Sequence, residues 1–129
     1  MTGVQAKLTI NGEFDGVQSG AALCIYRITQ EALRNVAKHA MVAAAAVELR
    51  HSDGLLSLTV SDKGVGMDLA SVEATAGLGL VSIRERTRLA GGSVEITSTP
   101  NQGTAITVHI PEQQASLVGK ADPGFRQIG

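Results

Sequence analysis

Residues 21–40, AALCIYRITQEALRNVAKHA, form the stretch that decides the first layer of the fold. Apolar residues recur in it at steps of three and four, at Ile25, Ile28, Ala32, Val36 and Ala40. This spacing predicts an amphipathic helix over residues 21–40, with its apolar side on a core. The polar stripe beside that side contains Arg27, Glu31, Asn35, Lys38 and His39. A stripe of this kind fits a shared ligand site, and it also fits a plain solvated helix face.

Alternating or helical patterns occur on both sides of this helix. A weak strand pattern covers 6–10, and a hairpin is predicted from 47–50 and 56–60 around the turn at 52–54. A second helix over 80–90 is stopped by two glycines, and a second hairpin joins 94–96 to 106–110. This order predicts an α+β fold, a two-layer sandwich with helices packed on one face of a mixed, mostly antiparallel sheet. We expect one domain over residues 1–111 and a flexible tail over 112–129.

The composition excludes several functional classes. The 129 residues carry 11 Lys and Arg against 12 Asp and Glu, and only three aromatic residues, so no direct nucleic-acid binding is expected. The longest apolar run, residues 40–47, is far shorter than the roughly 20 residues that span a bilayer. Residues 1–10 lack the layout of a signal peptide, so any membrane anchor is expected upstream of this chain. The single Cys24 fits a reducing, cytoplasmic compartment.

Candidate binding residues follow the predicted strands and open the second helix. Asp62-Lys63-Gly64-Val65-Gly66 comes directly after a strand, and alternation places Asp62 on the buried face, where a carboxylate needs a donor or a ligand. An ordinary Asp turn fits this segment as well. Alternation also places Thr104 on the core face. The run Gly77-Leu78-Gly79-Leu80 suits a phosphate at a helix start, or a simple loop-to-helix junction. Neither the Walker A loop nor the dinucleotide fingerprint occurs.

Taken in order, these segments resemble the ATP-binding superfamily of gyrase, heat-shock chaperone ATPases, histidine kinases and mismatch-repair ATPases. The string ITQEALRNVAKHA at 28–40 resembles its N box, and residues 62–66 and 77–80 resemble its two glycine boxes. Residues 77–111, with IRER at 83–86, Gly91-Gly92 and Gly103-Thr104, are similar to sensor histidine kinases of the nitrate-response type. The resemblance covers about residues 5–111 and implies the Bergerat-type fold, which agrees with the two-layer order of elements.

The resemblance implies a role for each matching residue. Asp62 would accept a hydrogen bond from the adenine amino group, with support from Thr104, and Asn35 would hold Mg²⁺. Glu31 would act as general base or orient the attacking nucleophile. Lys38 and His39 would neutralise phosphate charge. The remaining nucleotide contacts would come from the backbone of the two glycine boxes, at Gly64, Gly66, Gly77, Leu78, Gly79 and Leu80.

Members of this family transfer the γ-phosphate of ATP to a histidine on a two-helix dimerisation segment. A response regulator then receives the phosphoryl group from that histidine. No such segment precedes residue 5, and His39, His51 near a turn and His109 on the solvent side do not fit the acceptor. The chain is therefore expected to be the catalytic and ATP-binding module alone, with residues 67–76 as a short lid. It would be cytoplasmic, by itself or as part of a membrane-bound kinase. The alternatives are a serine kinase that sequesters a sigma factor, and a non-catalytic ATP-responsive interaction module.

Overall fold

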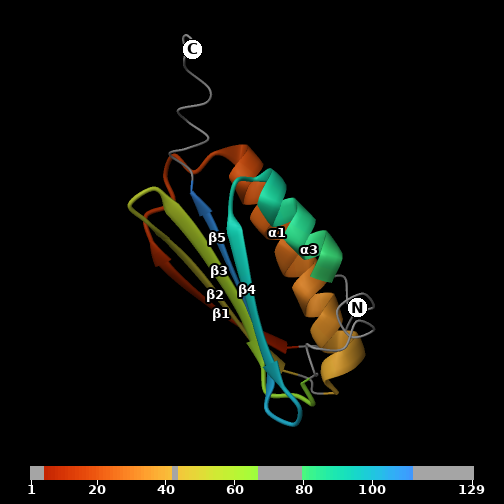
Figure 1. The fold of residues 1–129 in the computed structure, drawn as a ribbon. Helices are drawn as coiled ribbons and strands as arrows, with labels where there is room; N and C mark the ends of the chain where they lie inside the picture. The colour runs from red at the N-terminus through yellow and green to blue at the C-terminus, as the bar shows by residue number, and fades with distance from the viewer. Residues whose placement is uncertain (1–4, 42–43, 67–79, 112–129) are drawn as a thin grey trace.

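The computed structural model describes residues 5–41, 44–66 and 80–111. Five strands and two helices, with a short π-helix after the first helix, make up this part of the chain (Figure 1). The elements in chain order are β1 (Gln5–Gly12), α1 (Ser19–Asn35), η1 (Val36–Ala40), β2 (Ala44–Ser52), β3 (Leu55–Asp62), α3 (Leu80–Leu89), β4 (Ser93–Thr99) and β5 (Gly103–Pro111).

The strands form one sheet in the order β1-β2-β3-β5-β4. The pair β1 and β2 is parallel, and the other three pairs are antiparallel. Both helices lie side by side on the same face of this sheet (Figure 1). The predicted two-layer fold with a mixed, mostly antiparallel sheet is therefore confirmed, and so are both hairpins.

The core fills the space between the two layers. The helices contribute Ile25, Ile28 and Ala32 from α1 and Leu80 and Ile83 from α3, all at most 6% exposed. The central strands contribute every second residue, as alternation requires when one face of a sheet is covered. These strand residues are Val47, Leu56, Leu58, Val60, Ile106, Val108 and Ile110.

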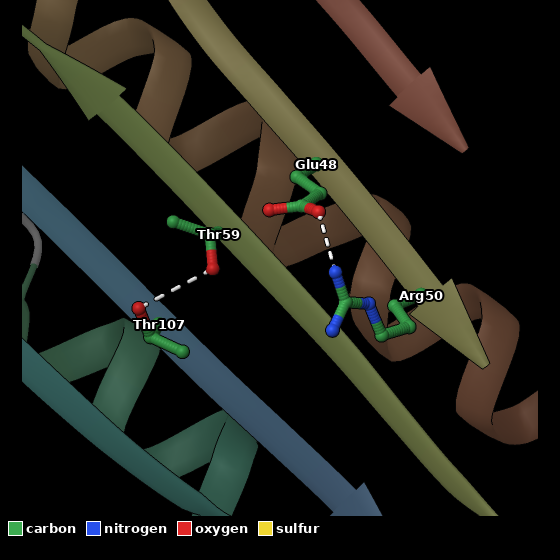
Figure 2. A network of polar contacts seen from close by, with 4 residues as sticks. All are labelled: Glu48, Arg50, Thr59 and Thr107. Carbon is green, nitrogen blue, oxygen red and sulfur yellow. Dashed lines mark hydrogen bonds and ion pairs between the residues drawn. The ribbon is translucent and has the colours of Figure 1, made fainter. Parts of the chain in front are cut away.

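The opposite face of the sheet is polar, because the alternate positions of the same strands carry charged and hydroxyl side chains (Figure 2). On β2, Arg50 pairs with Glu48 at 2.9 Å. Thr59 and Thr107 share a hydrogen bond of 3.3 Å between β3 and β5. Every strand that carries a core side chain thus turns a polar side chain away from the helices.

Turns and caps follow the local chemistry of the sequence. Asp53 and Gly54 between β2 and β3 both have positive φ, which is the backbone of the tight hairpin turn that Asp-Gly favours. At the end of α3, Gly91 has a φ of 76°, and Gly92 N–H donates to the Thr87 carbonyl at 2.9 Å. This Gly-based cap ends the helix where the two glycines predicted it.

The first helix departs from the single regular helix predicted over residues 21–40. It begins at Ser19, and from Val36 to Ala40 it continues as a π-helix. Val36 N–H is shared between the carbonyls of Ala32 and Leu33. Met41, with a φ of 60°, then leaves the helix in a left-handed conformation. The widened turn directly follows Asn35, and such π-helical turns occur frequently at functional sites.

Two expectations fall outside the residues that the structure describes. These are the lid with the second glycine box up to Gly79, within 67–79, and the tail 112–129. Within the described ranges, no helix has the length and apolar character needed to cross a membrane.

Candidate functional site

The polar residues singled out from the sequence gather at one end of the sandwich. The end of β3, the β4–β5 turn and the last turns of α1 and η1 all lie at the lower end of Figure 1. Two groups of residues occupy this end. The strand-end cluster consists of Asp62, Gly64, Gly66, Ser98, Gly103 and Thr104. The helix-end group consists of Glu31, Asn35 and Lys38.

Asp62 is the last residue of β3, and its side chain is half-buried. Its Oδ1 accepts a hydrogen bond from Gly64 N–H at 2.7 Å, so the segment does form the Asx turn considered above. A carboxylate has a second oxygen, and within the described part of the chain nothing donates to Oδ2. The turn therefore fixes the direction of the carboxylate and leaves one oxygen for another donor.

Thr104 lies directly across from Asp62, because the two are Cα partners in the antiparallel pair of β3 and β5. The predicted placement of both on the helix-covered side of the sheet is confirmed by this register. Thr104 Oγ1 contacts Ser98 Oγ on β4 at 2.7 Å. Ser98 Oγ in turn donates to the Gly103 carbonyl at 3.1 Å. The side chains of three neighbouring strands thus lie in one row at this end.

Two glycines allow the backbone to close around that row. A Cβ at Gly103 would lie 2.1 Å from the Asp62 carbonyl oxygen, and one at Gly66 would lie 2.0 Å from the Thr99 carbonyl oxygen. Both glycines have positive φ, at 96° and 64°. Asn101 N–H donates to the Val65 carbonyl at 2.6 Å, which ties the first glycine box to the β4–β5 turn. Side chains larger than hydrogen would force these segments apart.

The polar side chains of the helix-end group have fewer partners among the described residues than those of the strand-end cluster. Glu31, with 22% of its side chain exposed, pairs with Arg34 at 2.8 Å. Asn35 Nδ2 is buried and has no hydrogen-bond partner in 5–41, 44–66 or 80–111. Lys38 is exposed and makes no ion pair with another described residue. His39 lies in η1, and its side chain is outside the described part.

Leaving a buried amide N–H without an acceptor costs free energy, so the Nδ2 group of Asn35 is suited to donate to a bound acceptor. The Asn35 side chain also carries a carbonyl oxygen, which is the hard donor that Mg²⁺ prefers. The donor set at the end of α1 therefore fits a Mg²⁺-bound phosphate group.

The pocket at the strand ends has a volume of about 310 Å³. Its lining includes Asp62, Ser98, Gly103 and Thr104, and the pocket extends around the sheet end to Ser61, Thr97 and Ala105, which the register places on the face away from the helices. Asn35 is not part of this lining, so the described residues alone do not join the two groups in one pocket. Leu80 has only 1% of its side chain exposed, and its side chain belongs to the core. A phosphate contact from Leu80 would thus use its backbone N–H.

Ser98 and Gly103 were not among the predicted site residues. Counting outward from the turn at 100–102 would have placed Ser98 opposite Thr104 on the same face, as the register confirms. No local pattern marks Gly103 as the point where β5 approaches Asp62. That approach involves residues about forty positions apart, which local sequence reading does not reach.

The two described histidine side chains lie away from this end. His51, expected near a turn, is within β2, where its Nδ1 contacts the Glu13 carbonyl and its ring lies 5.6 Å from that of Phe14. His109 contacts Ser57 Oγ at 3.0 Å on the polar face of the sheet, as its position in the alternation predicted. Cys24 is half-buried beside α3, and burial raises the pKa of its thiol.

The fold and these residues agree with a family match. Residues 20–114 match the family described as histidine kinase-, DNA gyrase B-, and HSP90-like ATPase, and the chain belongs to this family. The resemblance inferred from the N box and the first glycine box is thereby confirmed.

Two similar proteins are sensor histidine kinases by name, which points to one branch of this family. The chain is 39% identical to an uncharacterized sensor-like histidine kinase of Chloroflexus aurantiacus over 77% of this chain and 18% of that protein. It is 39% identical to the oxygen sensor histidine kinase NreB of Staphylococcus carnosus, over 67% of this chain and 25% of that protein. The chain thus spans about a quarter or less of the length of these relatives.

A solved structure of similar fold is also a histidine kinase domain. The histidine kinase domain of the blue-light activated histidine kinase of Erythrobacter litoralis EL346 superimposes with a TM-score of 0.65 and 28% identity. The match covers 84% of this chain and 56% of that one. The chain is therefore an ATPase-family domain homologous to sensor histidine kinases, and the serine kinase alternative is not favoured.

Proposed function

We propose that this chain is the catalytic domain of a sensor histidine kinase, which binds Mg²⁺-ATP and transfers the γ-phosphate to a histidine on a helix outside it. The observation that carries the proposal is the pairing of two features at one end of the sandwich. One is the second oxygen of the Asp62 carboxylate, to which no described residue donates, and the other is the buried Asn35 amide, which has no acceptor among the described residues. Homology to sensor histidine kinases supports the class of reaction.

Asp62 would recognise the base. Its Oδ1 is held by Gly64, and its Oδ2 would accept a hydrogen bond from the 6-amino group of adenine. Guanine carries a carbonyl at that position, and two acceptors would then face each other. The lost charge-assisted hydrogen bond corresponds to roughly 1.5–3 kcal/mol of discrimination. Adenine is therefore the base that this carboxylate selects.

The helix-end group would hold the phosphates. The Asn35 carbonyl oxygen would be a ligand of Mg²⁺, and its buried N–H would donate to a phosphate oxygen. Lys38 and His39 would add positive charge, and backbone N–H groups of Gly77, Leu78, Gly79 and Leu80 would contact the phosphates. Bound Mg²⁺ supplies charge neutralisation on the phosphate oxygens. Positioning and charge compensation, rather than covalent chemistry, would account for most of the rate.

Glu31 would act on the incoming histidine. The carboxylate lies one helical turn before Asn35, and it is held in place by Arg34 at 2.8 Å. It would orient the imidazole and take its N–H proton as the ring nitrogen attacks the γ-phosphorus. The new N–P bond forms while the bond between the γ-phosphorus and the bridging oxygen breaks, and ADP leaves with that oxygen.

The partner would be a two-helix dimerisation segment of the same or another chain, and a response regulator would then receive the phosphoryl group. Homology to sensor histidine kinases supports these partners and a cytoplasmic location as part of the proposal. The length of the relatives, several times that of this chain, leaves room for such a segment.

Isothermal titration calorimetry with Mg²⁺-ATP tests the proposal. We expect the parent protein to bind and Asp62→Asn to bind at least about tenfold more weakly, because the amide keeps the turn but lacks the charge. Asp15→Asn is the matched control, since it removes the same charge from an exposed position before α1 and should bind as the parent does. Equal binding by the parent and Asp62→Asn would contradict the site.

A further inference from the structure

The row of side chains across three strand ends has a fixed order of hydrogen bonds. Ser98, Thr104 and Asp62 are successive Cα partners on β4, β5 and β3. They therefore share one face of the sheet, and the two hydroxyls lie 2.7 Å apart. Thr104 is in the middle of the row, between the serine and the carboxylate.

Counting protons gives the direction of each bond. The Ser98 hydroxyl has one proton, and it is donated to the Gly103 carbonyl, which can only accept. In the contact between Ser98 and Thr104, the proton must therefore come from Thr104. Thr104 Oγ1 is left with lone pairs only for any further contact. Next to the free oxygen of Asp62, it forms a second acceptor.

We infer that Ser98 is a positioning residue that holds the Thr104 hydroxyl as an acceptor and thereby sets the preference of the site for 6-amino over 6-oxo purines. This inference rests on the proposed binding of the base at Asp62. A 6-amino group carries two N–H donors and suits an edge made of two acceptors, directly or through a water molecule. A 6-oxo group carries no proton and meets acceptors only.

Removing the Ser98 hydroxyl changes which groups at this edge accept a hydrogen bond and which donate one. In Ser98→Ala, Thr104 loses the Ser98 oxygen that accepts its proton, and its hydroxyl can turn that proton toward the base or toward the Asp62 carboxylate. Either change takes away an acceptor that a 6-amino group uses. When the proton faces the base, a 6-oxo purine also finds one donor at the site. The preference for adenine should fall even though neither Asp62 nor Thr104 has been changed.

The test compares the dissociation constants of Mg²⁺-ATP and Mg²⁺-ITP by calorimetry. These nucleotides differ at position 6 of the base, so their ratio measures discrimination there. We expect Ser98→Ala to lower the ATP-to-ITP preference by about tenfold. Ser98→Thr keeps the hydroxyl and should restore the preference. Ser93→Ala, at the exposed start of the same strand, is the matched control and should not change it.

A double mutant separates positioning from a general loss of structure. In Thr104→Val there is no hydroxyl to orient, so adding Ser98→Ala should not change the ATP-to-ITP ratio further. Independently of nucleotide, the Thr104 hydroxyl proton should be observable by NMR as a slowly exchanging signal in the parent. A parent protein in which that proton exchanges as fast as an exposed hydroxyl would overturn the inference, even if Ser98→Ala proved unfolded.

The outcomes also separate this inference from the proposed function. A parent that binds ATP, loses affinity in Asp62→Asn, and keeps its ATP-to-ITP ratio in Ser98→Ala would overturn only the role of Ser98. A parent that binds neither nucleotide would overturn the proposed function and this inference together.

Discussion

The strand-end cluster and the helix-end group lie at the same end of the molecule but are built in opposite ways. In the strand-end cluster, side chains and backbone satisfy one another: Gly64 donates to Asp62, and Ser98 links Thr104 to the Gly103 carbonyl. In the helix-end group, the buried amide of Asn35 has no partner in the part of the chain that the structure describes, and Lys38 is exposed. Among the described residues, the strand-end cluster supplies its own hydrogen-bond partners, whereas the helix-end group leaves the Asn35 amide without one.

The proposed function gives this difference a physical reason. A base is recognised by the fixed direction of a few hydrogen bonds, so the groups that read it must be held before it arrives. Phosphates and Mg²⁺ bring strong charges of their own, which repay the cost of ordering a less constrained donor set. The following variants test this contrast from the largest expected effect to the smallest.

Gly103→Ala should disrupt the strand-end cluster most strongly. The new Cβ would lie 2.1 Å from the Asp62 carbonyl oxygen, and an alanine would be strained at a φ of 96°. We expect the free energy of unfolding in urea to fall by about 3 kcal/mol, as the sum of backbone strain and overpacking.

Gly20→Ala is the control for the loss of a glycine as such. Gly20 is in the first turn of α1, and outside its own helix backbone and chain neighbours no described atom lies within 4 Å of a Cβ placed there. This variant should be unchanged or more stable by up to about 1 kcal/mol, because alanine favours the helix. Equal destabilisation by both variants would show that close approach at Gly103 is not the cause.

Asn35→Ala should have opposite effects on stability and on binding. The change removes a buried N–H that no described residue accepts from, and it places a good helix former at the end of α1. We expect the free energy of unfolding of the free protein to rise by about 1 kcal/mol. Calorimetry should show Mg²⁺-ATP binding weakened at least about tenfold.

The sign of the stability change decides the interpretation of Asn35. If Asn35→Ala lowered the free energy of unfolding, the amide would be part of the structural support rather than a group that waits for a ligand. Asn35→Asp sharpens this test, since it keeps an oxygen for Mg²⁺ and removes the unpartnered N–H. Its binding should depend more steeply on Mg²⁺ concentration than that of the parent.

The sequence predicted the parts of the fold that depend on local periodicity. The alternation of Leu56, Leu58 and Val60 identified the buried face of β3, and it correctly extended to Asp62. The Asp-Gly turn and the double glycine after α3 were also found where they were predicted. Each of these features is set by neighbours within a few residues in the chain.

What the sequence did not predict depends on contacts between distant segments. Ser98 owes its role to the register of β4 against β5, and Gly103 owes its role to the approach of β5 to the end of β3. The π-helical turn at 36–40 is likewise invisible to a helical period, because its apolar residues keep nearly the same spacing. The strand faces and turns that carry the candidate site were therefore predicted better than the contacts that support it.

Arg34→Ala gives the smallest expected effect and tests whether Glu31 needs its ion pair. The pair with Glu31 spans 2.8 Å, but Arg34 is 53% exposed, so solvent screens much of the attraction. We expect the free energy of unfolding to fall by no more than about 0.5 kcal/mol. Arg50→Ala, which breaks a similar pair with Glu48 on the opposite face of the sheet, should cost as little (Figure 2). If Arg34→Ala alone lowered the free energy of unfolding in urea by more than about 1 kcal/mol, internal contacts would stabilise the helix-end group as they do the strand-end cluster. The contrast between the two groups would then fail.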